Sequence, residues 1–222
     1  MPMWFAHFRC ARGLLPGDPV NLLWGALCPD VDKISSIPRR MSHLGGRDRA
    51  LEPARFLASL GLDRDRARPH LHFLCGYLSH LALDDAWYGT LYENRLSPNW
   101  TETTTRAATL LWDLEARLDV TPPDLLPARG EHMVSFLTPD AVRTLRKAAH
   151  MYLSWDGNLE PVPGQLREIS AWKVSFSQML SQERARAEPA LARIPREETW
   201  ARLQDRARVA VERLVEHVQA AE

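Results

Sequence analysis

The chain has 222 residues, which is long enough for one domain with a substantial hydrophobic core. Its 28 basic and 28 acidic residues cancel, so no net charge draws it to nucleic acid or to an anionic membrane surface. Nucleic acid could still be a substrate, but the charge balance gives no support for nucleic-acid binding.

Three cysteines, Cys10, Cys28 and Cys75, are too few and too scattered for a disulfide framework, and none forms a CxxC pair. We expect them to be small buried apolar residues. The N-terminus lacks the basic and long apolar regions of a signal peptide, and no stretch approaches the ~20 apolar residues of a transmembrane segment. The expectation is therefore a cytoplasmic, soluble protein.

Helical spacing of Ala, Leu, Arg and Glu, with few alternating β-branched runs, predicts an all-α fold. A first helix is expected over residues 4–15, where LPGDP ends it. Asp18 is expected to cap a second helix over 19–27, which ends at CPDVD. Residues 33–50 are expected to form a loop or short turns that carry SHLGG, and residues 52–60 a third helix.

The longest apolar stretch, HLHFLCGYLSHLALDDAWYGTLY, follows Pro69 and has apolar residues on nearly every face. This pattern predicts a buried central helix around which the other helices form a bundle. Further helices are expected over 101–118, 139–153, 165–193 and 197–221. We expect one domain over 1–222, with a core over 1–119 and a C-terminal helical extension of unassigned role over 120–222. If the chain is divided anywhere, the GNLEPVPG segment, 157–164, is the place where the sequence favours a boundary between the core and the C-terminal helices.

The central helix carries His80 and Asp84, four residues apart and therefore on the same face. A buried carboxylate without a partner is costly, and a cation shared with the histidine would remove that cost. A metal-free His–Asp hydrogen bond would explain the pair equally well. Asp85 points about 100° away from Asp84 and is expected to cap or pair elsewhere.

Three other segments offer further candidate ligands. GALCPDVD places Asp30 and Asp32 directly after an apolar helix, where an Asp could also cap the next turn. His43 lies in MSHLGG, whose two glycines would let the backbone approach another element closely. His7 lies between Phe5 and Phe8, where a lone histidine is usually part of the core. Together they form a mixed nitrogen and oxygen set that suits Zn²⁺ or another divalent transition metal.

The order and wording of these motifs resemble the zinc-dependent phospholipase C family, which is related to the single-strand-specific zinc nucleases. The resemblance covers residues 1–119 and is strongest over Gly76 to Asp84. It implies a phospholipase C-like helical bundle in which Asp30, His43, His80 and Asp84 hold one zinc. It further implies that His7 and Asp84 hold a second, with Asp84 as the bridge. We expect one Zn²⁺, and His7 allows two.

The sequence departs from that family in two respects. Secreted members use their processed N-terminal residue as a ligand, whereas this chain shows no signal to cleave, and Met1 is a poor substitute. The family's third zinc takes a histidine shortly after the central-helix aspartate and a His-x-x-x-Glu pair. Here DAWYGT contains no histidine, and Leu111 stands four residues before Glu115. A third site is not expected.

Around the five ligands, Asp32, His72 and Glu115 are candidates for supporting contacts. The aromatic residues Trp87, Tyr88, Trp112, Tyr152 and Trp155 could line a cleft for a lipid or a base, although such residues more often belong to a core.

The leading hypothesis is a zinc-dependent phosphoesterase of phospholipase C-like type, with Asp30 as ligand and general base, acting on a small phosphoester or a phospholipid head group. The alternative is a helical binding or scaffold protein that keeps the family core without catalysis. A phosphohydrolase of the His-Asp class ranks lower, because it needs a consecutive His-Asp pair that the sequence lacks.

Overall fold

The computed structural model describes residues 4–45, 51–93, 101–117, 131–154 and 176–220. Within these ranges every regular element is a helix, so the all-α prediction is confirmed. No helix in the described part of the chain combines the length and the apolar character needed to cross a membrane.

The longer helices follow the predicted order. They are α1 (Trp4–Ala11), α2 (Pro19–Leu27), α4 (Pro53–Ser59), α6 (Leu71–Glu93), α7 (Glu102–Arg117), α8 (Pro139–Ser154), α10 (Phe176–Leu191) and α11 (Arg196–Gln219). Short helical turns lie between them: the 3₁₀ helix η1 (Cys28–Lys33), α3 (Arg39–Ser42), α5 (Arg64–Ala67), η3 (Arg68–His70) and η4 (Glu131–Met133).

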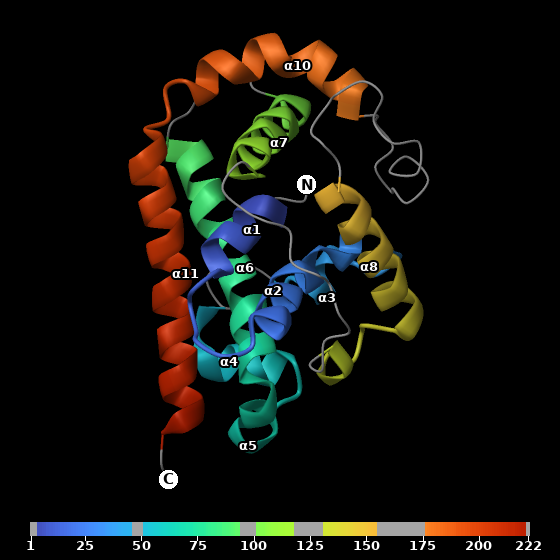
Figure 1. Cartoon of the computed structure of the whole chain (residues 1–222), viewed down its shortest axis with the longest axis vertical. Coiled ribbons are helices and arrows are strands. Elements are labelled where there is room, and N and C mark those ends of the chain that lie inside the picture. The colour runs from blue at the N-terminus through green and yellow to red at the C-terminus, as the bar shows by residue number, and fades with distance from the viewer. Residues whose placement is uncertain (1–3, 46–50, 94–100, 118–130, 155–175, 221–222) are drawn as a thin grey trace.

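Helix α6 is the central element of the fold, with α2 on one side and α11 along another (Figure 1). Its residues Phe73 to Leu78 are almost completely buried, as expected for a helix that is apolar all round. The side chain of Asp18 accepts a hydrogen bond from the Asn21 amide, so the predicted cap of α2 is present.

Two glycines allow α2 and α6 to pack backbone against backbone. A Cβ atom on Gly25 would lie 2.0 Å from the Phe73 carbonyl oxygen, and a Cβ on Gly76 would lie 1.9 Å from the Leu22 carbonyl oxygen. Side chains at these positions would force the helices apart. The contact therefore holds the C-terminal half of α2 against the N-terminal third of α6.

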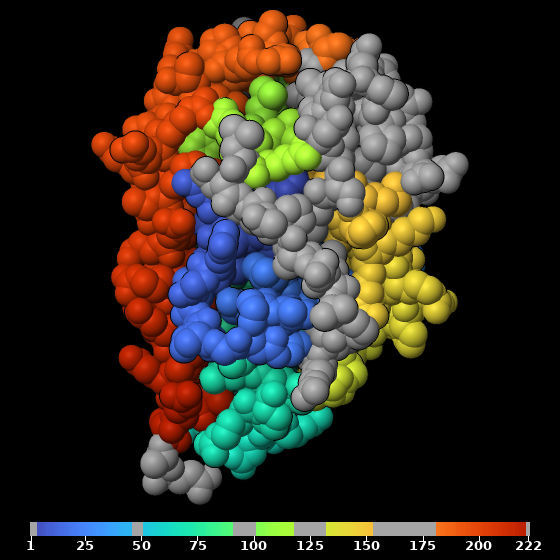
Figure 2. All heavy atoms as spheres, viewed as in Figure 1, coloured from blue at the N-terminus to red at the C-terminus, as the bar shows by residue number. Residues whose placement is uncertain are grey.

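The C-terminal helices complete the core. Helix α10 packs across α7, while α11 runs along α6 and also touches α1, α4 and α5. Trp200, Leu203 and Leu214 of α11 are buried in the same core cluster as α6. In the space-filling view α11 forms a continuous flank beside the N-terminal helices (Figure 2). The candidate boundary at 157–164 lies outside the described residues.

Some predicted bounds differ from the observed ones. Helix α1 ends at Ala11 instead of residue 15, because Gly13 adopts a left-handed φ of 82° that stops the helix. The predicted helix over 165–193 is described only from Phe176, where α10 begins. The short helix α3 occupies part of the predicted loop over 33–50.

Candidate metal centre

The structure brings together the five side chains proposed as ligands. They come from α1 (His7), η1 (Asp30), the C-cap of α3 (His43) and the middle of α6 (His80 and Asp84). Three of them, His7, Asp30 and His80, are at most 2% exposed, whereas the His43 and Asp84 side chains are 11% and 17% exposed. The cluster thus has a buried interior and one side nearer the surface.

Asp84 connects the histidines of the cluster. Its Oδ1 lies 3.7 Å from His7 Nε2, while its Oδ2 lies 3.4 Å from His43 Nε2 and 3.9 Å from His80 Nε2. On the other side, His80 Nε2 lies 3.9 Å from Asp30 Oδ1. Two groups of side chains in this cluster have the spacing to hold a metal ion: His7, His80 and Asp84, and Asp30, His43 and His80.

The His80 ring is oriented by the close contact between α2 and α6. Its Nδ1 lies 2.7 Å from the Ala26 carbonyl oxygen, and because a carbonyl can only accept, Nδ1 carries the proton. The lone pair is therefore on Nε2, which points into the cluster and has no hydrogen-bond partner among the described residues. A backbone carbonyl on the second nitrogen is a common arrangement behind metal-ligating histidines.

His7 stacks on His80, with the ring centroids 3.6 Å apart and the planes 10° from parallel. Neither His7 nitrogen has a hydrogen-bond partner in the described part of the chain, although both are buried. Burial lowers the pKa of His7 to about 3 and that of His80 to about 4. Both rings are therefore neutral near pH 7, the state in which imidazole binds metals.

Asp30 is fixed by the N-terminal helix, because Trp4 Nε1 donates a 3.0 Å hydrogen bond to its Oδ2. Burial alone would raise the pKa of Asp30, but the nearby charges of His80 and Lys33 lower it to about 2. Burial would also raise the pKa of Asp84, but the adjacent imidazoles of His43, His80 and His7 hold it well below its usual range. Both carboxylates are ionised and able to bind a cation.

His43 is held by its neighbour in sequence. Ser42 Oγ donates to the Arg39 carbonyl, so it can only accept from His43 Nδ1, 2.9 Å away. This leaves the Nε2 lone pair for the cluster. The expected close approach at the following glycines is not found at Gly45, where a Cβ would meet nothing within 4 Å. Gly45 instead provides a left-handed φ of 81° directly after His43 and Leu44.

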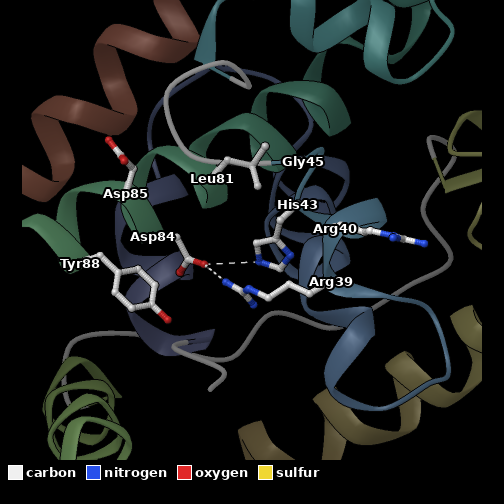
Figure 3. Close-up of a pocket in the computed structure, with 8 residues that line it drawn as sticks. All are labelled: Arg39, Arg40, His43, Gly45, Leu81, Asp84, Asp85 and Tyr88. Atoms are coloured by element: carbon white, nitrogen blue, oxygen red, sulfur yellow. Dashed lines mark hydrogen bonds and ion pairs between the residues drawn. The ribbon is translucent and has the colours of Figure 1, made fainter. Parts of the chain in front are cut away.

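A cavity of about 340 Å³ opens beside His43 and Asp84. Its lining residues are Arg39, Arg40, His43, Gly45, Leu81, Asp84, Asp85 and Tyr88. Arg39 points toward Asp84, whereas Arg40 and Asp85 point away from it (Figure 3). Arg39 Nη2 donates a 2.8 Å hydrogen bond to Asp84 Oδ2. Among the described members of the predicted aromatic set, Tyr88 lines this cavity and Trp87, Trp112 and Tyr152 are buried, while Trp155 lies outside the described residues.

Of the supporting residues, Asp32 lies beside the cluster, with Oδ1 3.9 Å from His43 Nδ1. His72 does not join it: eight residues before His80 correspond to about 12 Å along a helix, and its Nε2 lies 2.9 Å from the Pro16 carbonyl. Glu115 pairs instead with Arg196 of α11. Asp85 pairs with Arg206, so its expected separation from Asp84 is confirmed.

Sequence reasoning missed two residues of this region, Asp113 and Arg39. Asp113 is fully buried and accepts hydrogen bonds from the Ala6 amide at 2.8 Å and the Tyr152 hydroxyl at 2.6 Å. It thereby anchors the helix that carries His7. The available signal was an acidic residue within the apolar stretch TLLWDLEA, since a buried carboxylate needs partners. No comparable signal marks Arg39, whose long side chain has many accessible directions.

No protein-family model matches this sequence, and neither a curated protein nor a solved structure matches the chain.

Proposed function

We propose that this protein is a metal-dependent hydrolase whose centre binds Zn²⁺ and acts on a phosphoester. One observation carries the proposal. Three imidazoles that are at most 11% exposed, those of His7, His43 and His80, converge on two ionised carboxylates. The Nε2 atom of each ring has no hydrogen-bond partner among the described residues. Buried polar atoms without partners are costly and rare. Bound cations would satisfy all three nitrogens.

The geometry fits the ligand assignment that the family resemblance implies. Asp30, His43, His80 and Asp84 would hold one ion, and His7 with Asp84 would hold a second. The bridging role suits Asp84, because its two oxygens face different histidines. Nitrogen and carboxylate ligands of this kind suit zinc. When bound, zinc supplies Lewis acidity toward a phosphoryl oxygen and lowers the pKa of a ligating water.

The cavity indicates where a substrate would approach. It is lined by His43 and Asp84 but not by Asp30, which lies deeper and is bonded to Trp4. A carboxylate with a pKa near 2 is also a weak base. We therefore assign Asp30 to metal binding alone and not to general base catalysis. The volume of the cavity matches a small phosphoester or a lipid head group better than a long chain.

The likeness of GALCPD and GYLSHLALDD to motifs of the zinc-dependent phospholipase C family supports the proposed zinc site from the sequence, independently of the geometry. The two motifs contribute Asp30, His80 and Asp84, and their glycines Gly25 and Gly76 form the tight contact between α2 and α6. The same two motifs therefore account for both the packing and the cluster.

A second candidate function is a catalytically inactive binding or scaffold protein. The hydrogen bond from Arg39 to Asp84 favours it, because a guanidinium already balances part of the negative charge of the cluster. In that case Arg39 takes the place of a metal ion as the permanent counter-ion, and the purified protein would contain no zinc.

Hydrolysis assays with and without metal separate these functions. The chain would be stripped with chelator, reloaded with Zn²⁺ and tested on bis-p-nitrophenyl phosphate and p-nitrophenylphosphorylcholine. The proposal predicts activity that requires zinc and is lost in His80→Gln. The exposed His150→Gln variant is the matched control and keeps the activity. Failure to hydrolyse either substrate after reloading would contradict the proposal, and a protein that also took up no zinc would favour the scaffold function.

A further inference from the structure

Arg39 has an unusual position for an arginine at the edge of a candidate metal centre. Its side chain is 39% exposed at the cavity, yet its Nη2 reaches the 17% exposed carboxylate of Asp84. Its Nη1 is a buried atom without a hydrogen-bond partner among the described residues, and it lies 3.7 Å from Asp32 Oδ2. Nη2 of the guanidinium is thus hydrogen-bonded to Asp84, whereas the donors of Nη1 remain without a hydrogen-bond partner among the described residues.

Asp84 Oδ2 is the atom for which Arg39 competes with the cluster. It accepts from Arg39 at 2.8 Å and also faces His43 Nε2 at 3.4 Å and His80 Nε2 at 3.9 Å. An oxygen that serves as a metal ligand has less negative charge to share with a guanidinium. Arg39, which lines the cavity, can then present its planar pair of nitrogens to an anion bound there (Figure 3).

The local charges agree with an anionic ligand. Around the cluster, the three carboxylates of Asp30, Asp32 and Asp84 outnumber the two cations of Lys33 and Arg39 by one. One divalent ion would make this region net positive, and Arg40 adds a further positive charge to the cavity lining. Because Asp85 is paired with Arg206, it does not offset this charge.

We propose that Arg39 is the residue that recognises the substrate's phosphoryl group, by binding two of its unesterified oxygens as a fork. This inference rests on the proposed function and specifies its substrate class: a small molecule with a phosphoryl group that keeps at least two free oxygens. Arginine binds phosphate in this bidentate manner, whereas lysine provides a single point charge.

Binding of inorganic phosphate to zinc-loaded protein, dialysed free of excess metal and followed by calorimetry, tests the inference without an activity assay. We expect Arg39→Gln to weaken phosphate binding at least about tenfold and Arg39→Lys to recover only part of the loss. Arg55→Gln, at an exposed position of α4, removes the same charge at a distance and is expected to bind phosphate like the wild type. Zinc content and circular dichroism of each variant establish that its fold is intact.

Equal phosphate affinity in wild type and Arg39→Gln, with zinc retained, would overturn the role of Arg39 and leave the proposed metal centre standing. A wild-type protein that binds no zinc would overturn the proposed function itself. Phosphocholine and glycerophosphocholine, titrated in parallel, distinguish a phosphomonoester from a diester head group. If the zinc-loaded wild type bound none of the three compounds, the inference would also be overturned.

Discussion

The imidazole rings of His7 and His80 stack in parallel, 3.6 Å apart, and both Nε2 atoms face the carboxylate of Asp84. Two parallel rings direct their lone pairs along separate lines, which favours one ion for each ring over a single shared ion. The separation of the rings is close to the roughly 3.5–4 Å between metals in binuclear hydrolytic sites. Asp84 is placed to bridge them.

The tight contact between α2 and α6 should be essential for the fold. On helix propensity alone, Gly76→Ala would stabilise the protein by roughly 1 kcal/mol. We expect instead a loss of about 3 kcal/mol or more, because the new Cβ would lie 1.9 Å from a backbone oxygen that cannot move aside. Gly25→Ala should behave in the same way. Urea unfolding measures the stability of the two variants, and a variant more stable than the wild type would contradict the close contact.

The hydrogen bond from Trp4 to Asp30 should affect metal binding. Trp4→Phe keeps an aromatic ring in the core but leaves Asp30 Oδ2 without its indole donor. We expect zinc affinity to fall by about 10- to 100-fold, as measured by competition with a chromophoric chelator. Trp112→Phe is the matched control, since the Trp112 Nε1 atom has no hydrogen-bond partner among the described residues. Equal affinities in the two variants would count against the ligand role of Asp30.

Asp113 should make stability depend on pH. Burial raises its pKa from 3.8 to about 7, against the opposing hydrogen bonds from Tyr152 and the Ala6 amide. The folded state thus binds its proton more tightly than the unfolded chain does. The associated stability is fully present below about pH 4 and is lost as pH rises through 7, by at most about 4 kcal/mol.

The variant Asp113→Asn removes this titration while keeping an acceptor for the Ala6 amide. We expect the wild type to lose stability relative to this variant as pH rises from 4 to 8, so the difference between their unfolding free energies changes in favour of the variant. Asp140→Asn, at an exposed position, should leave the profile of the wild type unchanged. Parallel profiles for wild type and Asp113→Asn would show that Asp113 is not protonated in the folded state.

Much of this arrangement follows from local sequence pattern. Apolar residues on every face of the 71–93 stretch predict its central position, and the spacing of His80 and Asp84 predicts that they share a face. The convergence of His7, Asp30 and His43 on that face depends on tertiary packing, and it could be anticipated only through the family resemblance. The glycines of GALCPD and GYLSH carry this information, because they set how closely the two helices approach.

Other features depend on contacts between distant segments and leave little trace in the sequence. Arg39 reaches Asp84, 45 residues away, through a flexible side chain whose direction no periodicity predicts. The family motif singles out Glu115 and gives no role to Asp113. The two lie about 200° apart around α7, so only Asp113 faces α1.

Elemental analysis of the purified, dialysed protein tests the central claim most directly, with wild type, His7→Ala and His80→Ala measured side by side. The account predicts about two Zn²⁺ per chain in the wild type and about one in His7→Ala. In His80→Ala it predicts at most about one, because this variant removes a ligand of the ion held with Asp30 and His43. Wild-type protein without zinc after reloading, or a His80→Ala variant with undiminished zinc, would contradict a metal centre at these five side chains.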